Sequence, residues 1–569
     1  MATHDYVIDN STGANVRSDL NNVLQAILTN NSSGSAPSTT ASYMLWADTS
    51  NNLLRMRNTA NDGWVDLRTL AGGISSSADA TINSVSVGKG ANSVAGNTVL
   101  GESALDASVT GGSNTAIGKL ALTTNTSGVQ NVAVGAQSLD SNTTGQNNVA
   151  VGFRASDQIS TGSSNTSLGA FALFSNTTAN SNVAIGKDAL LSNNTGENNV
   201  AVGATALDAC TTGSSHTAVG TSALTAVTTG NFNVGIGQSA GAAITTGSSN
   251  TAVGQESLQA TTTASDNTAL GRHSLKANTT GDSNTAIGSV ALDANETGSE
   301  NVAVGRNSLG SSTTGSSNTA AGRSALSNAT TSSDNTAVGK EALTALTTGN
   351  DTVSIGSGSL KAQTTGHSNV GIGKDVGQLL TTGQENVLAG RRAGSSITSA
   401  GGCVCLGNQA GLNQITTGNH QCYIARSASS SGSASTWLYG NSNGECFQGD
   451  NTSSWSTTSD RRLKKNIVDS AKGLAEIDQL RVANFEYRTQ NEIDMSEFPL
   501  AEGPHQVVLG EGNEKVHTGV IAQEVEAVLP ECIKVSEKGA KTVNTDPILW
   551  ALVNAVKELS AKVKSLEAG

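Results

Sequence analysis

Aromatic residues and proline are scarce in this chain. Only 7 Phe, 5 Tyr and 5 Trp occur among 569 residues, and proline is absent from Ser38 through Phe498. Large rings supply much of the buried area of an ordinary enzyme core, so their scarcity argues against thick globular cores. A long proline-free stretch suits a continuous β ladder, in which every backbone donor is used. A thin and repetitive structure is therefore expected.

Long apolar runs and basic clusters are also missing from most of the chain. No run approaches the roughly 18 apolar residues of a membrane-spanning helix, and the start MATHDYVIDN lacks the pattern of a signal peptide. The net charge is −13, and the long Asn-, Thr-, Ser- and Gly-rich stretches contain no Lys/Arg cluster. We therefore expect a protein that is made in a cytoplasm, without membrane insertion and without a nucleic-acid partner.

A glycine ends short apolar phrases such as NTAIG and NVAVG, and it recurs with a 17-residue period through 18 consecutive units. These glycines are Gly101, Gly118, Gly135, Gly152, Gly169, Gly186, Gly203, Gly220, Gly237, Gly254, Gly271, Gly288, Gly305, Gly322, Gly339, Gly356, Gly373, Gly390 and Gly407. A fixed period of this kind is the signature of a solenoid. Each unit is predicted to form one coil.

The interior of each coil is predicted to be a narrow aliphatic stripe. Alternation in Val132, Ala133 and Val134 puts the two valines on one face of a strand. A Leu usually lies four residues after the glycine. Where it is missing, an apolar residue lies seven residues after the glycine, and these residues are Ile159, Ile244, Leu380 and Ile397. The two positions are expected to fill the same core volume.

These repeats resemble the coiled repeats of phage tail fibres over residues 82–425 and, more loosely, the head repeats of trimeric autotransporter adhesins. The resemblance implies a fibrous β-solenoid. A thin solenoid buries little apolar surface per residue, so three chains are expected to share an axis as a homotrimer. The repeat shaft is assigned to residues 101–425, and residues 73–100 are predicted to form a transition or cap.

Residues 1–72 are predicted to form a small α+β module. Val16, Leu20, Val23 and Ile27 form a short helical seam, which either starts a three-stranded bundle or packs as an isolated helix. Short strands with Trp46 and Trp64 follow. The module resembles the N-terminal attachment segments of phage tail fibres, which implies contact with tail or baseplate proteins.

Residues 426–458 interrupt the repeat and bring four aromatic residues close together in sequence. These are Trp437, Tyr439, Phe447 and Trp455. If they are exposed, their rings can stack on sugars of a host cell-surface receptor, which would make this segment the distal tip. A structural cap over the last coil is equally compatible with the sequence.

Residues 459–569 differ from the rest of the chain, because they hold 14 Lys or Arg and 18 Asp or Glu. They begin with SDRRLKKNI, continue through HTGVIAQEVEAVLPE and end in a helix that starts near Asp546. Residues spaced by 3 and 4 form the seam of a predicted parallel coiled coil. They are Leu549, Leu552, Val556, Leu559, Val563 and Leu566.

The first of these motifs contains a nucleophile and a candidate base. Ser459 offers a hydroxyl, and Lys464 can remove its proton if burial or the neighbouring cations favour the neutral amine. On the residues alone, a solvated basic turn with Ser459 as a helix cap is the competing interpretation.

Together, the two motifs resemble the intramolecular chaperone domain of the endosialidase and tail-spike group, assigned to peptidase family S74. The resemblance implies that residues 459–569 trimerise, assist folding of the fibre and cut themselves off at the Thr458–Ser459 bond. Ser459 and Lys464 would be the catalytic dyad, with Asp460 and Arg462 in support. The second motif contributes His517 and Gln523, to which no chemical role is assigned.

Cysteine and acidic residues show no pattern that demands a metal or a cofactor, and none is expected. Cys403, Cys405 and Cys422 are interpreted as small hydrophobic residues rather than ligands, because no His or carboxylate is repeated beside them. Acidic residues recur at no fixed place in the repeat, so a paired-carboxylate glycosidase site is not supported.

The sequence thus predicts a mainly β, trimeric fibrous β-solenoid with a C-terminal α+β chaperone that ends in a trimeric coiled coil. The expected function is that of a phage tail fibre, located in the virion tail and assembled in the host cytoplasm. A bacterial surface adhesin is the alternative, disfavoured by the lack of a secretion signal and membrane anchor. A polysaccharide-degrading tail spike is a second alternative, but no residue pattern supports it.

Overall fold

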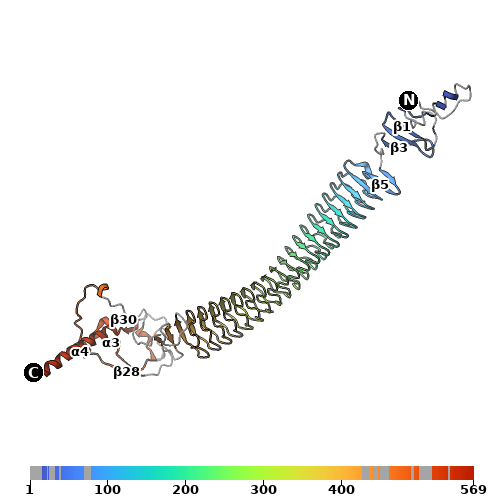
Figure 1. Ribbon diagram of the computed structural model, residues 1–569. Coiled ribbons are helices and arrows are strands. Elements are labelled where there is room, and N and C mark those ends of the chain that lie inside the picture. Colours follow the sequence, from blue (N-terminus) through green and yellow to red (C-terminus); the bar gives the residue numbers. More distant parts are fainter. Residues whose placement is uncertain are drawn as a thin grey trace. The chain divides into compact units, whose positions relative to one another are not determined.

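The computed structural model is mainly β, and its long repeat region is a β-solenoid, as the 17-residue period predicts (Figure 1). The chain divides into two compact units, Met1–Ser454 and Trp455–Gly569. The structure describes residues 16–18, 20, 21, 24, 33–37, 40, 42–69, 79–425, 436–440, 446–448, 461–488, 492–498, 516–535 and 539–569.

The N-terminal module contains an antiparallel sheet of three strands, β1 (Leu45–Asp48), β2 (Leu53–Arg57) and β3 (Trp64–Thr69). The rings of Trp46 and Trp64 lie 5.1 Å apart, and Trp46 is buried. The two tryptophans therefore pack together on the expected short strands, with Trp64 half-buried. In the expected helical seam, Val16 and Leu20 are helical, whereas Val23 and Ile27 lie outside the described residues.

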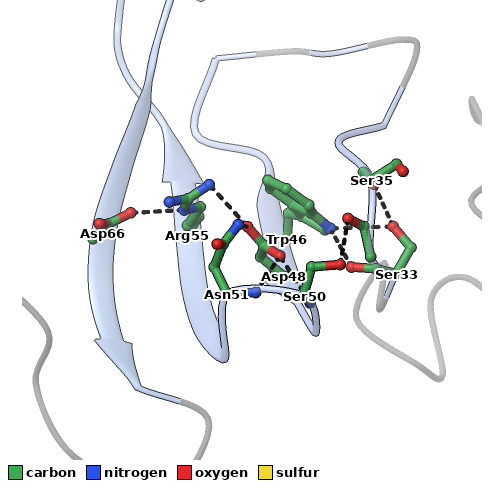
Figure 2. A network of polar contacts seen from close by, with 9 residues as sticks. Ser33, Ser35, Trp46, Asp48, Ser50, Asn51, Arg55 and Asp66 are labelled. Carbon is green, nitrogen blue, oxygen red and sulfur yellow. Dashed lines mark hydrogen bonds and ion pairs between the residues drawn. The ribbon is translucent and has the colours of Figure 1, made fainter.

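A buried carboxylate holds the β1–β2 hairpin together (Figure 2). Asp48 accepts hydrogen bonds from the backbone N–H groups of Ser50 and Asn51 and from the Asn51 side chain, and it pairs with Arg55 at 2.8 Å. Arg55 also pairs with Asp66 on β3 at 2.7 Å. Burial would raise the pKa of Asp48, but the hydrogen bonds and the guanidinium charge outweigh it and lower that pKa. The network therefore ties all three strands together.

Each coil of the solenoid contributes one strand of three residues. These strands are β7 (Thr115–Ile117), β8 (Val132–Val134), β9 (Val149–Val151), β10 (Thr166–Leu168), β11 (Val183–Ile185), β12 (Val200–Val202), β13 (Thr217–Val219), β14 (Val234–Ile236), β15 (Thr251–Val253), β16 (Thr268–Leu270), β17 (Thr285–Ile287), β18 (Val302–Val304), β19 (Thr319–Ala321), β20 (Thr336–Val338), β21 (Val353–Ile355), β22 (Val370–Ile372), β23 (Val387–Ala389) and β24 (Val404–Leu406). Successive strands pair in parallel with a step of one repeat, as in Val200 with Thr217.

The middle residue of each strand faces the core, and the first and third residues face outward. In β8, Ala133 is fully buried, whereas Val132 and Val134 are half-buried. The expected alternation is therefore present, and the structure shows that alanine occupies the inner face. The remaining core volume is filled mainly by leucines such as Leu122 and Leu139, which are fully buried.

The leucine four residues after the glycine adopts a left-handed backbone conformation, with φ of 53° at Leu122 and 52° at Leu224. This conformation costs a residue with a Cβ about 1–2 kcal/mol, which burial of the side chain offsets. At Gly241 the leucine is absent, and a Cβ there would lie 2.9 Å from Cδ1 of the buried Ile244. In this coil the two positions therefore compete for the same space, as predicted. Other coils fill both positions, as with the buried Leu224 and Val227.

A ladder of buried asparagines runs along the solenoid beside the strands. The Asn131 N–H donates to Asn114 Oδ1 at 2.9 Å, and Asn131 Nδ2 donates to the Gly145 carbonyl at 2.8 Å. Similar bonds recur from coil to coil, so each side chain satisfies backbone groups that face the interior. The asparagine that precedes most strands therefore satisfies the interior of the stack, whereas His216, Thr352 and Cys403 take its place in three coils.

His216 replaces asparagine in one rung. Its backbone N–H donates to Asn199 Oδ1 at 3.0 Å, and its Nδ1 accepts from the Asn233 N–H at 3.2 Å. Its Nε2 is buried and has no hydrogen-bond partner among the described residues. Burial lowers the pKa of this imidazole.

Replacing His216 by Asn should stabilise this part of the solenoid by about 1 kcal/mol, because the amide can complete the rung. The gain should be larger at pH 5.5 than at pH 7.5. Unfolded histidine binds a proton below about pH 6.5 whereas the buried ring resists it, so the wild type loses stability as the pH falls. Hydrogen-exchange protection of the Asn233 amide measures both effects. Equal protection in the two proteins at both pH values would contradict the prediction.

Antiparallel strands extend the sheet beyond the repeats at both ends. Strands β4 (Ala80–Ile82) and β5 (Val85–Gly88) lead into β6 (Thr98–Gly101), with the short η1 turn (Ala91–Ser93) between β5 and β6. At the other end, β25 (Cys422–Ala425) pairs with β26 (Thr436–Gly440), which pairs with β27 (Cys446–Gln448). These strands cover the parallel edges that the first and last coils would otherwise expose.

The second unit is a small α+β fold. Its elements are η2 (Arg461–Leu463), α2 (Leu474–Ile477), β28 (Ala483–Phe485), η4 (Met495–Glu497), β29 (His517–Gly519), α3 (Ala522–Val528), η6 (Pro530–Cys532), β30 (Ile533–Val535), β31 (Lys541–Val543) and α4 (Asp546–Glu567). β28 pairs with β29 and β30 pairs with β31, both antiparallel. Val525, Leu529 and Cys532 form its buried core. No helix of the described residues has the length and apolarity to cross a membrane.

Candidate functional site

The first chaperone motif forms a short exposed turn. Arg462 lies in η2, and the Lys464 N–H donates to the Arg461 carbonyl at 3.2 Å. Arg461, Arg462, Lys464 and Lys465 are all exposed in the single chain. Thr458, Ser459 and Asp460 lie outside the described residues. The structure therefore places the candidate base and its cationic neighbours but leaves the geometry of the dyad untested.

The second motif spans β29 and α3, and its histidine lies in an aromatic cluster. The His517 ring stacks on Phe485 with centroids 5.9 Å apart and meets the edge of Tyr487 at 5.1 Å. Its Nε2 is buried without a hydrogen-bond partner among the described residues. Sequence reasoning assigned His517 no role, and the aromatic alternation in the phrase NFEY is the signal that could have linked it to β28.

An ion pair joins the second motif to the segment after α2. Arg481 contacts Glu524 of α3 through two hydrogen bonds of 3.1 and 2.5 Å. This pair lowers the pKa of the Glu524 carboxyl, chiefly through the hydrogen bonds from Arg481. Glu526 pairs with Lys541 of β31. The acidic residues of GVIAQEVE thus fix α3 within the unit, and Gln523 lies on the same helix outside these two pairs.

Helix α4 has two unlike faces. Ala551 and Ala555 are buried, Asn554 Nδ2 donates to the Lys472 carbonyl at 2.9 Å, and Glu558 accepts a hydrogen bond from the Leu474 N–H. The six predicted seam residues are all exposed, including Val556 at 59%. The helix therefore packs on α2 through one face and leaves a long apolar face without a partner in the single chain.

The four aromatic residues of the expected tip fall into different environments. Trp437 is 61% exposed on β26, whereas Tyr439 is half-buried and stacks on Tyr423 of the preceding strand at 6.1 Å. Phe447 lies opposite Tyr439 in the backbone register of β27, and its side chain is not described. Trp455 lies outside the described residues. Tyr439 thus packs against the core of the last coils, as the cap interpretation expects, and the ring of Trp437 is accessible.

A second aromatic cluster lies on the shaft and was missed by sequence reasoning. Phe153 and Phe171 meet at 5.3 Å, and Arg154 lies 4.7 Å from the ring of Phe174 and pairs with Asp157 at 2.6 Å. Phe153 is 47% exposed. Comparing positions across successive repeats would have revealed this cluster, because it gathers three of the seven phenylalanines in two coils.

Three cysteines of the shaft are buried, and a fourth, Cys422, is half-buried. Cys210, Cys403 and Cys405 are fully buried. Burial raises the pKa of Cys210 to about 11 and also raises that of Cys405, so both thiols stay protonated near neutral pH. Within the described part of the chain, no group of three or more His, Cys, Asp or Glu side chains is arranged to hold a metal ion.

The comparison with known families supports the assignment of the C-terminal motifs. Residues 459–534 match the model of the family described as chaperone of endosialidase, and the match begins at Ser459. No curated protein and no solved structure matches the chain. Through these residues, which hold both motifs, the C-terminal unit is similar to the chaperone of endosialidase.

Proposed function

We propose that this protein is the subunit of a homotrimeric phage tail fibre whose C-terminal unit is a self-cleaving intramolecular chaperone. One observation supports the proposal most strongly. A long β-solenoid is followed in the same chain by residues that match the chaperone of endosialidase, and this match begins at Ser459. The N-terminal module then attaches to tail or baseplate proteins of the virion, and the opposite end of the shaft meets the host cell-surface receptor.

The apolar face of α4 supports trimerisation by the C-terminal unit. Its exposed residues follow the 3 and 4 spacing of a parallel coiled coil, whereas the other face is already occupied by contacts with α2 and the segment before it. Exposure of this apolar face to water is unfavourable for an isolated chain. Three parallel α4 helices bury it and bring three shafts to the same starting point.

Alignment of the three chains by the C-terminal unit would make folding of the shaft easier. Its strands pair over steps of a whole repeat, and three long repetitive chains can align in many wrong registers. A trimeric seed at one end selects the register in which all chains begin together. Removal of the seed after folding then leaves a fibre whose unfolding is slow, because the end at which the three chains first associated is gone.

The cleavage step follows from the position of Ser459 directly after the scissile bond. Lys464, as a neutral amine, takes the hydroxyl proton while Oγ attacks the carbonyl carbon of Thr458. The amide C–N bond breaks, its nitrogen takes a proton, and an ester joins Thr458 to Ser459 Oγ. Water then hydrolyses the ester, which gives a Thr458 carboxylate and a free hydroxyl on Ser459. Each chain performs this reaction once.

The mass of the purified protein tests the proposal. Light scattering should give three times the mass of one chain, both for the full-length protein and for the shaft after cleavage. Labelled antibodies against the shaft should also decorate the tails of intact virions. A monomeric shaft, or a virion free of the protein, would contradict the proposal.

Trp437 is proposed as the main receptor contact of the distal end, because its ring is accessible and a sugar can stack on it. Replacing Trp437 by Ala should lower binding of the purified fibre to host cells by about tenfold, since loss of one stacked ring costs on the order of 1–2 kcal/mol per chain. Phe153→Ala removes an exposed ring elsewhere on the shaft and serves as the control. Unchanged binding by the Trp437 variant, measured by flow cytometry with a labelled fibre, would remove this residue from the receptor site.

A further inference from the structure

The outward face of the solenoid sheet carries an unbroken stripe of uncharged side chains, most of them aliphatic. We define the outer stripe as the first and third residues of strands β7 to β24. Every first residue is Thr or Val, and every third residue is Val, Ile, Leu or Ala. Because the strands pair in register, these side chains stack in two continuous rows from coil to coil.

The outer stripe is half-buried to exposed in the single chain. Large side chains in its third row remain open to solvent, among them Leu168 at 47%, Ile236 at 39% and Leu270 at 45%. These side chains are not part of the core, which is filled by the middle strand residues and the leucines of the turns. Contiguous apolar surface of this length is unusual on a soluble monomer and marks a surface that is covered in the assembled protein.

Charged residues are placed beside the outer stripe but not in it. The position directly after the strand glycine holds the exposed Lys187, Arg272 and Lys340 in different coils. The repeats therefore tolerate charge two residues away from the third row, while that row stays aliphatic in every coil. An open sheet face would be expected to alternate with polar residues, so this restriction indicates burial against a partner.

The spacing of the outer stripe favours another copy of the same chain as that partner. A parallel copy in register presents matching rows at every coil, whereas a partner without this repeat would match only locally. A neutral face also avoids the repulsion that identical charged faces would produce. The exposed seam of α4 independently favours association of several chains, and the proposed coiled coil is parallel.

We infer that the outer stripe is the surface through which three parallel copies of the chain pack around the axis of the shaft. This inference rests on the homotrimer of the proposed function and adds which face of the solenoid each chain turns toward the others. The charged residues that follow the strand glycine in some coils then lie at the edge of the interface or on the outside of the fibre. Closure around a threefold axis satisfies every stripe without an open edge.

Cysteine labelling of the full-length protein tests the inference. Ile236→Cys places a thiol in the outer stripe, and Gln238→Cys places one on the neighbouring exposed position of the same coil. Leu270→Cys and Arg272→Cys form a second matched pair. We expect the two stripe thiols to react with a maleimide about tenfold or more slowly than their partners, and equally fast after denaturation. Mass spectrometry of the labelled peptides separates these thiols from the native cysteines.

The outcome separates failure of the inference from failure of the proposed function. A trimer in which all four thiols react at similar rates would overturn the role of the outer stripe and leave the trimer intact. A protein that is monomeric by light scattering would overturn both. Lysine variants give a second readout that does not depend on labelling. Ile236→Lys should reduce the trimeric fraction, and Gln238→Lys should leave it unchanged; equal effects of the two would also contradict the inference.

Discussion

Wild-type protein is expected to yield two fragments, residues 1–458 and residues 459–569, whereas Ser459→Ala should remain a single full-length chain. Without the hydroxyl there is no oxygen to attack the Thr458 carbonyl, so cleavage should fall by several orders of magnitude. Denaturing electrophoresis and intact-mass measurement report the result. Because the alanine variant keeps every residue of the seam on α4, it should still form trimers with a folded shaft.

Two adjacent lysines supply the matched control for the base. Lys464 and Lys465 are adjacent lysines that are both exposed in the single chain, so a general electrostatic role would make them equivalent. Lys464→Ala should block cleavage, and Lys465→Ala should leave it largely intact. If both variants cleave normally, Lys464 is not the base. If wild-type protein stays at full length while trimeric, the chaperone role stands without the peptidase activity.

Replacement of the strand-ending Gly220 by Ala is expected to destabilise the shaft by about 3 kcal/mol or more. Gly220 has φ of +133°, a conformation that residues with a Cβ rarely adopt. An added Cβ would also lie 2.6 Å from the Gly237 carbonyl oxygen of the next coil. That atom belongs to a stacked backbone, which cannot move without breaking its own bonds to the following coil.

Guanidinium unfolding followed by circular dichroism measures this loss, and hydrogen exchange locates it. Protection should fall first in the coils on either side of Gly220, because each coil contacts mainly its neighbours. Thr221→Ala changes the next, exposed residue and should alter stability by less than about 0.5 kcal/mol. An equally stable Gly220→Ala protein would contradict the conclusion that the backbone conformation and close coil contact at this position require glycine.

The shaft could be predicted from the sequence because its interactions repeat. A fixed period brings equivalent residues of successive units into contact, so one unit such as Val200–Val202 predicts its neighbour Thr217–Val219. The exchange between Gly241 and Ile244 was visible for the same reason. Because of this repetition, a contact between coils is visible as a regular spacing in the sequence, and little further information is needed to predict the shaft.

The C-terminal unit was predictable only in part, because its contacts are not repeated. The seam of α4 follows from local spacing, but the pairing of Arg481 with Glu524 joins residues far apart in sequence. The aromatic cluster of Phe485, Tyr487 and His517 likewise depends on the pairing of β28 with β29. Such contacts arise from the fold as a whole and have no local signature.

By itself, the sequence determined the coil length, the core positions, the two chaperone motifs and the seam of the last helix. The tertiary structure alone decided which side of each strand is buried. Alternation in Val132, Ala133 and Val134 allows either face to point inward. The buried leucines of the turns leave room for only a small side chain beside them, so Ala133 turns inward and the valines are left for a partner.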